Sequence, residues 1–231
     1  MKLNLNLKIA IIAGVFTAPT AAFAQSDTFS HTGSVAMESG RLFPEQGLAL
    51  YDGFTVVADY TITHNQSGWY GNLWHAETGT RANNETDVCI GNRGAIDSAT
   101  SYDVSGCMFE IAGPEAYRLR LAASHALNEN WVVAVNGDIV RGGFETDTVR
   151  AQLQWHDEIF GPFTGSGSVG VSYDTWSEDT VARLKLGVSF PIFGVTATAA
   201  YDRFEVVSQG PLSRSSDRNG ENFSLSVGFA F

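Results

Sequence analysis

The last segment of the chain alternates strictly between apolar residues and small or polar ones. Its apolar positions are Phe223, Leu225, Val227, Phe229 and Phe231. Successive side chains of a strand point to opposite faces, so this period of two predicts a β-strand with one apolar face. Glu221–Phe231 also has the length of about ten residues with which the tilted strands of a β-barrel cross a lipid bilayer.

The same alternation recurs along most of the chain. With the last segment included, the candidate strands are Thr28–Glu38, Gly53–Thr63, Ser67–Glu77, Ala116–Leu127, Trp131–Arg141, Asp147–His156, Gly165–Asp174, Asp179–Phe190, Gly194–Val206 and Glu221–Phe231. Lipid offers no hydrogen-bond partners, so strands cross a membrane only as a closed barrel. Aromatic residues near both ends of these segments match the girdles of membrane barrels. We therefore predict an all-β fold, an antiparallel up-and-down transmembrane β-barrel of about ten strands, with eight or twelve as alternatives.

The connections between these segments alternate between short and long, except that two of the expected outer loops, after Arg141 and Asp174, are also brief. The longest are Ser39–Asp52, Thr78–Glu115 and Val207–Gly220. Bacterial barrels have short periplasmic turns, longer extracellular loops and both termini in the periplasm. The alternation therefore predicts a location in the outer membrane of a Gram-negative bacterium, with the short turns facing the periplasm.

Residues 1–24 differ from the rest of the chain. Lys2 and Lys8 are their only charged residues, Ile9–Phe16 is an apolar run, and Ala22-Phe23-Ala24 is a small-x-small ending. This order of basic, apolar and small residues is that of a secretory signal peptide. Residues 1–24 are therefore predicted to be a signal peptide, and residues 25–231 to form the outer-membrane barrel domain.

The chain is acidic, with a formal net charge of −11. Its overall field therefore does not favour nucleic acid as a partner. Cys89 and Cys107 are the only cysteines, and their spacing matches neither a zinc site nor a Cys-x-x-Cys redox motif. An even pair in an exported protein predicts a disulfide, which here would close a surface loop within the connection Thr78–Glu115.

Two motifs resemble known outer-membrane proteins. The final strand, with Phe229 and Phe231, resembles the C-terminal signal that the outer-membrane assembly machinery reads. The stretch Ser67–Trp74 reads Ser-Gly-Trp-Tyr-Gly-Asn-Leu-Trp and resembles a strand of the TorF-like porins. The connection Thr78–Glu115, with its two cysteines, departs from the pattern of that family. The resemblance implies a pore for small solutes.

The face opposite the apolar one carries charged residues in several candidate strands. Its bases are Arg118, Arg120, Arg150, Arg183 and Lys185, and its acids are Asp59, Asp138 and Asp202. On this count the lumen has an excess of positive charge. One interpretation is a basic constriction that favours anions, since rings of charge set the selectivity of pores. The other is an interior of paired charges that fills a narrow barrel, since buried charges must be paired or wet.

No set of residues indicates an enzyme. Ser124 and His125 are adjacent on a candidate strand and therefore point to opposite faces. His64 and Ser67 fall in a short turn, and His156 lies beside two acids at a strand end. Hydrolases and acyltransferases need a nucleophile and a base at one site. The sequence therefore predicts no catalytic residue, no metal ligand and no cofactor.

These features together predict a small porin or narrow channel for small polar solutes, with anions favoured if the basic cluster lines an open lumen. The alternative is a non-conducting structural or adhesion barrel that binds a partner through its outer loops. The expected partners are outer-membrane lipid and lipopolysaccharide, the assembly machinery and small solutes.

Overall fold

A computed structural model of the protein describes residues 28–43, 48–79, 84–111, 115–143, 145–211, 213 and 219–230. These residues form the strands β1 (Phe29–Phe43), β2 (Leu48–His64), β3 (Trp69–Glu77), β4 (Glu85–Ala95), β5 (Thr100–Ile111), β6 (Glu115–Ala126), β7 (Trp131–Gly142), β8 (Thr146–Phe160), β9 (Phe163–Asp174), β10 (Thr180–Ile192), β11 (Val195–Ser208) and β12 (Asn219–Ala230). No helix among the described residues is long and apolar enough to span a membrane. The predicted signal peptide and Phe231 lie outside the described residues.

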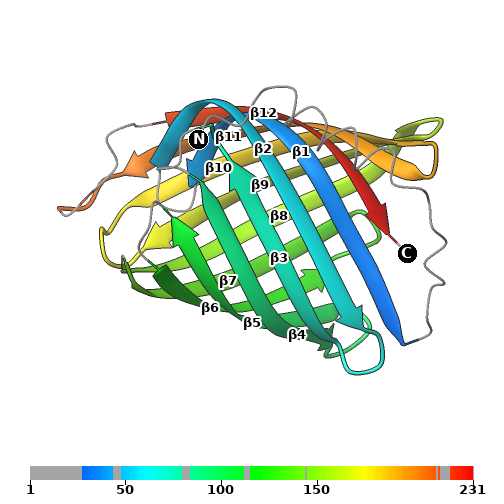
Figure 1. The fold of residues 1–231 in the computed structure, drawn as a ribbon, viewed down its shortest axis with the longest axis horizontal. Coiled ribbons are helices and arrows are strands. Elements are labelled where there is room, and N and C mark those ends of the chain that lie inside the picture. The colour runs from blue at the N-terminus through cyan, green and yellow to red at the C-terminus, as the bar shows by residue number, and fades with distance from the viewer. Residues whose placement is uncertain are drawn as a thin grey trace.

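The strands form one closed barrel in which each strand pairs with its neighbours in sequence (Figure 1). All pairs are antiparallel, and β1 closes the ring by pairing with β12. A closed ring has no sheet edge, so the backbone groups of all the strands find partners within the sheet. The predicted all-β antiparallel barrel is confirmed. Its described strands number twelve, which the sequence allowed although it favoured about ten.

Two strands were missed because their sequences are rich in charge. β4 and β5 occupy most of the segment Thr78–Glu115, which the sequence analysis assigned to an outer loop. The outer face of β4 has apolar residues only at Val88 and Ile90, while its other face carries acids, a cysteine, a glycine and an arginine. Such a composition is typical of a solvated loop. In this barrel the charged side chains of β4 instead lie in the lumen. The long-loop prediction for this segment is wrong.

The hairpin of β1 and β2 likewise replaces most of the predicted loop Ser39–Asp52. The ladder between the two strands is interrupted after Glu38, where the register shifts. Asn222 of β12 supports this irregularity, because its Oδ1 accepts hydrogen bonds from Ser39 N at 3.0 Å and from Gly40 N at 3.2 Å. These bonds attach the extended part of β1 to β12, the last strand of the barrel.

Short turns join the strands at the end of the barrel where β1 begins and β12 ends, which we call the terminal end; the opposite end is the loop end. In the β4–β5 turn, Asp97 Oδ1 accepts hydrogen bonds from the N–H groups of Ala99 and Thr100 at 2.8 and 2.7 Å. These donors hold the pKa of the Asp97 carboxyl below its usual value. Asn128 accepts two bonds in the same way in the β6–β7 turn, from Asn130 N and Trp131 N. Asn and Asp favour turns because their side chains bond to the backbone that follows.

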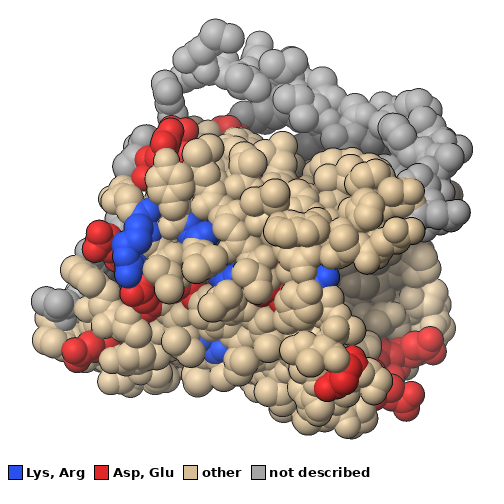
Figure 2. All heavy atoms as spheres, turned by 90° about the horizontal axis from the view of Figure 1, so that it is seen from below, with Lys and Arg blue, Asp and Glu red and all other residues tan. Residues whose placement is uncertain are grey.

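The outer surface of the barrel is apolar across its middle. Exposed apolar side chains there include Leu73, Ile90, Leu121, Val135, Val169, Val171, Leu186 and Leu225. In the view of Figure 2, uncharged residues cover most of the surface, and the acidic side chains gather toward the two ends. Soluble proteins rarely expose an apolar surface of this extent to water. The belt matches the lipid-facing band of a membrane barrel.

The disulfide joins two strands of the barrel wall. Cys89 of β4 and Cys107 of β5 are bonded, and they are direct partners in the register with Cα atoms 4.1 Å apart. The predicted pairing is therefore present, but its predicted position in a surface loop is wrong. Both cysteines lie on the inner face of a hairpin that spans the barrel.

Replacing both cysteines with serine is expected to leave the barrel intact and to lower its free energy of unfolding by about 3 kcal/mol. The backbone ladder between β4 and β5 holds the two strands together without the bridge. Urea unfolding measures the loss, and the heat-dependent shift in gel mobility reports the folded barrel. Absence of the folded band in the double variant would instead show that the bridge is required for assembly.

Candidate functional site

The inner face of the barrel is the surface on which the polar and charged side chains meet. Residues paired across neighbouring strands point to the same side of a sheet. The register therefore places every predicted lumen residue on the inner face. The bases Arg118, Arg120, Arg150, Arg183 and Lys185 lie on β6, β8 and β10, and the acids Asp59, Asp138 and Asp202 lie on β2, β7 and β11.

Three of these arginines form ion pairs with acids on a neighbouring or nearby strand. Arg120 binds Asp138 through two bonds, Nε to Oδ1 at 2.7 Å and Nη2 to Oδ2 at 2.8 Å. Arg183 binds Asp202 in the same forked way, with Nε 2.8 Å from Oδ1. The third pair joins Arg118 Nη2 and Asp87 Oδ2 at 3.1 Å. Forked Arg–carboxylate pairs are strong and hold both side chains in one orientation.

The inner-face charges of β4 and β5 were not predicted, because the sequence of both strands indicates a loop. With them, and with Glu38, Glu158 and Asp174 on other strands, the inner face carries the bases Arg93, Arg118, Arg120, Arg150, Arg183 and Lys185, and the acids Glu38, Asp59, Glu85, Asp87, Asp103, Asp138, Glu158, Asp174 and Asp202. Acids therefore outnumber bases among the described residues, and the expected excess of positive charge is not present. The sequence does contain a signal for strand β4. Glu85, Asp87 and Arg93 alternate with the apolar residues Val88 and Ile90.

A cavity of about 460 Å³ opens on the inner face between β4 and β8. Its polar lining consists mainly of Arg93, Asp103, Arg120, Asn136, Arg150 and Gln152. Ala122 and Ala134 lie between these residues and leave room because their side chains are short. Arg150 also donates from Nε to Asn136 Oδ1 at 2.9 Å. The cavity is large enough for a small solute together with water.

Apolar side chains fill the inner face toward the loop end. One buried cluster contains Phe109, Ala116 and Val140, and a second contains Val181, Phe204 and Val206. The guanidinium of Arg118 lies 5.6 Å from the centre of the Phe109 ring, which places the first cluster next to the ion pairs. These clusters narrow the lumen at the loop end.

The loop end is also tied together by buried acids. Asp179 accepts hydrogen bonds from Gly210 N at 3.0 Å and from Ser213 Oγ at 2.9 Å, which joins the segment after β9 to the segment after β11. Asp174 accepts one from Thr146 Oγ1 at 2.5 Å. These acids therefore serve the structure of the loop end, and their oxygens already have donors.

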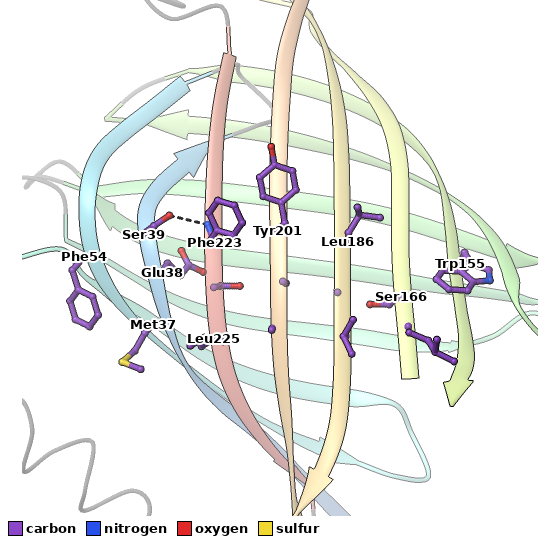
Figure 3. A pocket seen from close by; sticks show the side chains of 17 residues that line it. Met37, Glu38, Ser39, Phe54, Trp155, Ser166, Leu186, Tyr201, Phe223 and Leu225 are labelled. Atoms are coloured by element: carbon purple, nitrogen blue, oxygen red, sulfur yellow. Dashed lines mark hydrogen bonds between the residues drawn. The ribbon is translucent and has the colours of Figure 1, made fainter. Parts of the chain in front are cut away.

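A hollow of about 740 Å³ lies on the outside of the barrel and not in the lumen. Figure 3 shows its side chains on β1, β2 and β8 to β12, among them Met37, Phe54, Leu186, Tyr201, Phe223 and Leu225. These residues belong to the exposed apolar face, which faces lipid. The hollow is therefore part of the membrane surface.

The serine–histidine pairs named from the sequence do not form a catalytic arrangement on the inner face. Ser124 bonds with Ser101 at 2.7 Å, while His125 bonds with Thr100 at 3.0 Å on the other face. His64 Nδ1 and Ser67 Oγ lie 2.8 Å apart, but the same nitrogen also accepts from Ser67 N and so caps the β2–β3 turn. Among the described residues, no group of three or more His, Cys, Asp or Glu side chains is placed to hold a metal ion.

Comparison with known proteins identifies the fold. No family model and no curated protein matches the sequence. The KdgM porin in complex with disordered oligogalacturonate matches with a TM-score of 0.59 at 13% identity, over 87% of this chain and 99% of that chain. The NanC porin matches with a TM-score of 0.56 at 10% identity, over 86% and 98%. An outer-membrane channel from Pseudomonas putida F1 matches with a TM-score of 0.54 at 11% identity, over 88% and 96%.

At these identities the likeness shows the fold alone, which is that of small outer-membrane porins and channels. It agrees with the predicted class of barrel. The similarity of Ser67–Trp74 to a strand of the TorF-like porins stays a resemblance of that stretch.

The ion pairs of the lumen are expected to stabilise the folded barrel. Asp138→Ala should lower the free energy of unfolding by about 2–3 kcal/mol, because it removes the buried partner of Arg120 and leaves the guanidinium in the lumen without that carboxylate. Lys185→Ala is the control on the same face, since no ion pair between described residues includes Lys185. We expect it to change stability by no more than about 0.5 kcal/mol. Equal losses for the two variants in urea unfolding would contradict this account of the ion pairs.

Proposed function

We propose that this protein is a small channel of the bacterial outer membrane for small polar solutes. The observation that carries the proposal is the cavity on the charged inner face of a closed barrel whose outer face is apolar. Lipid covers such an outer face, and water and polar solutes wet such an inner face. Under this proposal the protein holds and passes its solute without chemical change.

The solved structures with this fold support the proposal. The KdgM and NanC porins and the channel from Pseudomonas putida F1 are outer-membrane pores of nearly the same length as the matched part of this chain. The oligogalacturonate found with the KdgM porin is a chain of sugar acids, and it is an example of a polar solute in a barrel of this kind.

The lumen of this chain favours polar solutes of either charge sign over a strict preference for anions. Its arginines on β6 and β10 are neutralised by Asp87, Asp138 and Asp202 within hydrogen-bond distance. A solute therefore meets local dipoles of both orientations instead of a field of one sign. We accordingly propose weak selectivity between small anions and cations.

A non-conducting barrel is the second candidate, and the apolar clusters at the loop end favour it. Phe109 and Phe204 are almost fully buried, so neither side chain lines a wide opening. An adhesion role through outer loops has less support, because β4 and β5 account for most of the longest predicted loop.

Single-channel recording in planar bilayers distinguishes the two candidates. We expect stepwise conductance from the wild type and a larger step from Phe204→Ala, because the truncation removes a ring from the narrow part of the lumen. The variant should fold with a stability reduced by about 3–5 kcal/mol. A folded, inserted and silent wild type would favour the non-conducting barrel. An unchanged step in the variant would place the narrowest point elsewhere.

Surface labelling tests the proposed orientation. A tag inserted at Asn128–Asn130, in the β6–β7 turn at the terminal end, should be hidden on intact cells, and one at Asn84 at the loop end should be accessible. The physical reason is that bacterial barrels keep their termini and short turns in the periplasm. The reverse labelling pattern would show that the barrel is inserted in the opposite direction.

A further inference from the structure

Two opposite charges line the lumen cavity side by side without binding each other. Arg93 of β4 and Asp103 of β5 are direct partners in the register, and both line the cavity. None of the ion pairs between described residues includes either of them. Arg120 and Asp138 are also direct partners on neighbouring strands, and they form a forked ion pair. The lack of an ion pair between Arg93 and Asp103 therefore depends on the side chains around them.

Tyr70 of β3 keeps the two charges apart. The guanidinium of Arg93 lies 5.2 Å from the centre of the Tyr70 ring, and its Nη2 donates to Thr63 Oγ1 at 2.6 Å. The Tyr70 hydroxyl donates to Asp103 Oδ1 at 2.8 Å. Both charges thus have neutral partners, and the tyrosine directs Arg93 toward β2 and away from the carboxylate.

A glycine makes the position of the tyrosine possible. Gly91 is the partner of Tyr70 in the register, and a Cβ atom added there would lie 2.5 Å from Cζ of the ring. Any other residue at this position would push the ring out of its place. Gly91 and Tyr70 therefore hold Arg93 and Asp103 apart at the border of the cavity. Arg120 and Arg150 border it as well, but Arg120 is paired with Asp138 and Arg150 bonds Asn136.

We propose that this cavity binds a small zwitterion of the α-amino-acid class, with its ammonium group at Asp103 and its carboxylate at Arg93. The proposal rests on the channel function for the access of the solute, and it adds a solute class to it. A solute with a single charge would satisfy one of the two groups and oppose the other. A zwitterion carries both charges on one molecule, so it can contact the Arg93 guanidinium and the Asp103 carboxylate, which form no ion pair with each other. The volume of about 460 Å³ holds an amino acid with its water.

The test compares four solutes of one shape: L-alanine, L-lactate, L-alaninamide and L-lactamide. They carry both charges, only the negative one, only the positive one and none, at about pH 6, where the amine of alaninamide stays protonated. Saturation-transfer NMR on the folded barrel in detergent measures weak binding and needs no conduction. We expect alanine to bind about tenfold more tightly than either singly charged solute, since each lost charge contact removes one charge-assisted hydrogen bond. Equal binding of alanine and lactamide would overturn the proposal.

Two conservative variants test the residues. Asp103→Asn and Arg93→Gln should each remove most of the preference for alanine, whereas Lys185→Gln, a lumen charge on β10 that does not line the cavity, should keep it. An unchanged preference in the first two variants would overturn the assignment. If either variant lacks the heat-modifiable band of a folded barrel, the comparison of the four solutes on the wild type decides alone.

The outcome is separate from that of the channel proposal. A barrel that conducts in bilayers and shows no preference among the four solutes remains a channel, and the zwitterion site is then wrong. A barrel that is silent in bilayers and prefers alanine keeps the site and loses the channel.

Discussion

The pairing of β1 with β12 is the contact on which the rest of the structure depends. It joins the first and last strands, so every strand has a neighbour on both sides. Without it the sheet would have two open edges, and each unpaired backbone group at an edge in lipid costs several kcal/mol. Closure also separates two environments. Across the middle of the barrel, the alternation of the strands then places apolar side chains on the outer face and charged ones in the lumen.

The charges of the lumen are stabilised mainly by their nearest neighbours. Arg120 and Asp138 show the general pattern, in which an arginine on one strand meets a carboxylate on the next. This arrangement avoids the cost of a buried single charge, and it also limits the field that the wall presents to a solute. Arg93 and Asp103 depart from the pattern because a tyrosine occupies the space between them. The charges of Arg93 and Asp103 are thus not neutralised by an ion pair, in contrast to those of Arg120 and Asp138.

Period-two alternation predicted those strands whose outer positions are apolar, because lipid tolerates little else there. The alternation did not predict β4 and β5. Their outer faces include Asn92, Gly94 and Gly106, and their acids suggested a solvated loop. The same error hid Asp87 and Asp103 from the count of lumen charges. Which charges pair depends on the register between strands and on the packing of single side chains such as Tyr70, and the alternation within a single segment reveals neither the partner strand nor that packing.

The bridge between Cys89 and Cys107 acts where the hydrophobic pattern is weakest. A slip of one residue turns every side chain of a strand to the other face, and burial resists such a slip only where one face is clearly apolar. The β4–β5 hairpin has little of that contrast. The bond holds one pair of residues opposite each other and thereby sets all the other pairs of the hairpin, Arg93 opposite Asp103 among them. A covalent bond between two adjacent strands therefore reinforces the register that places Arg93 beside Asp103 in the wall of the lumen.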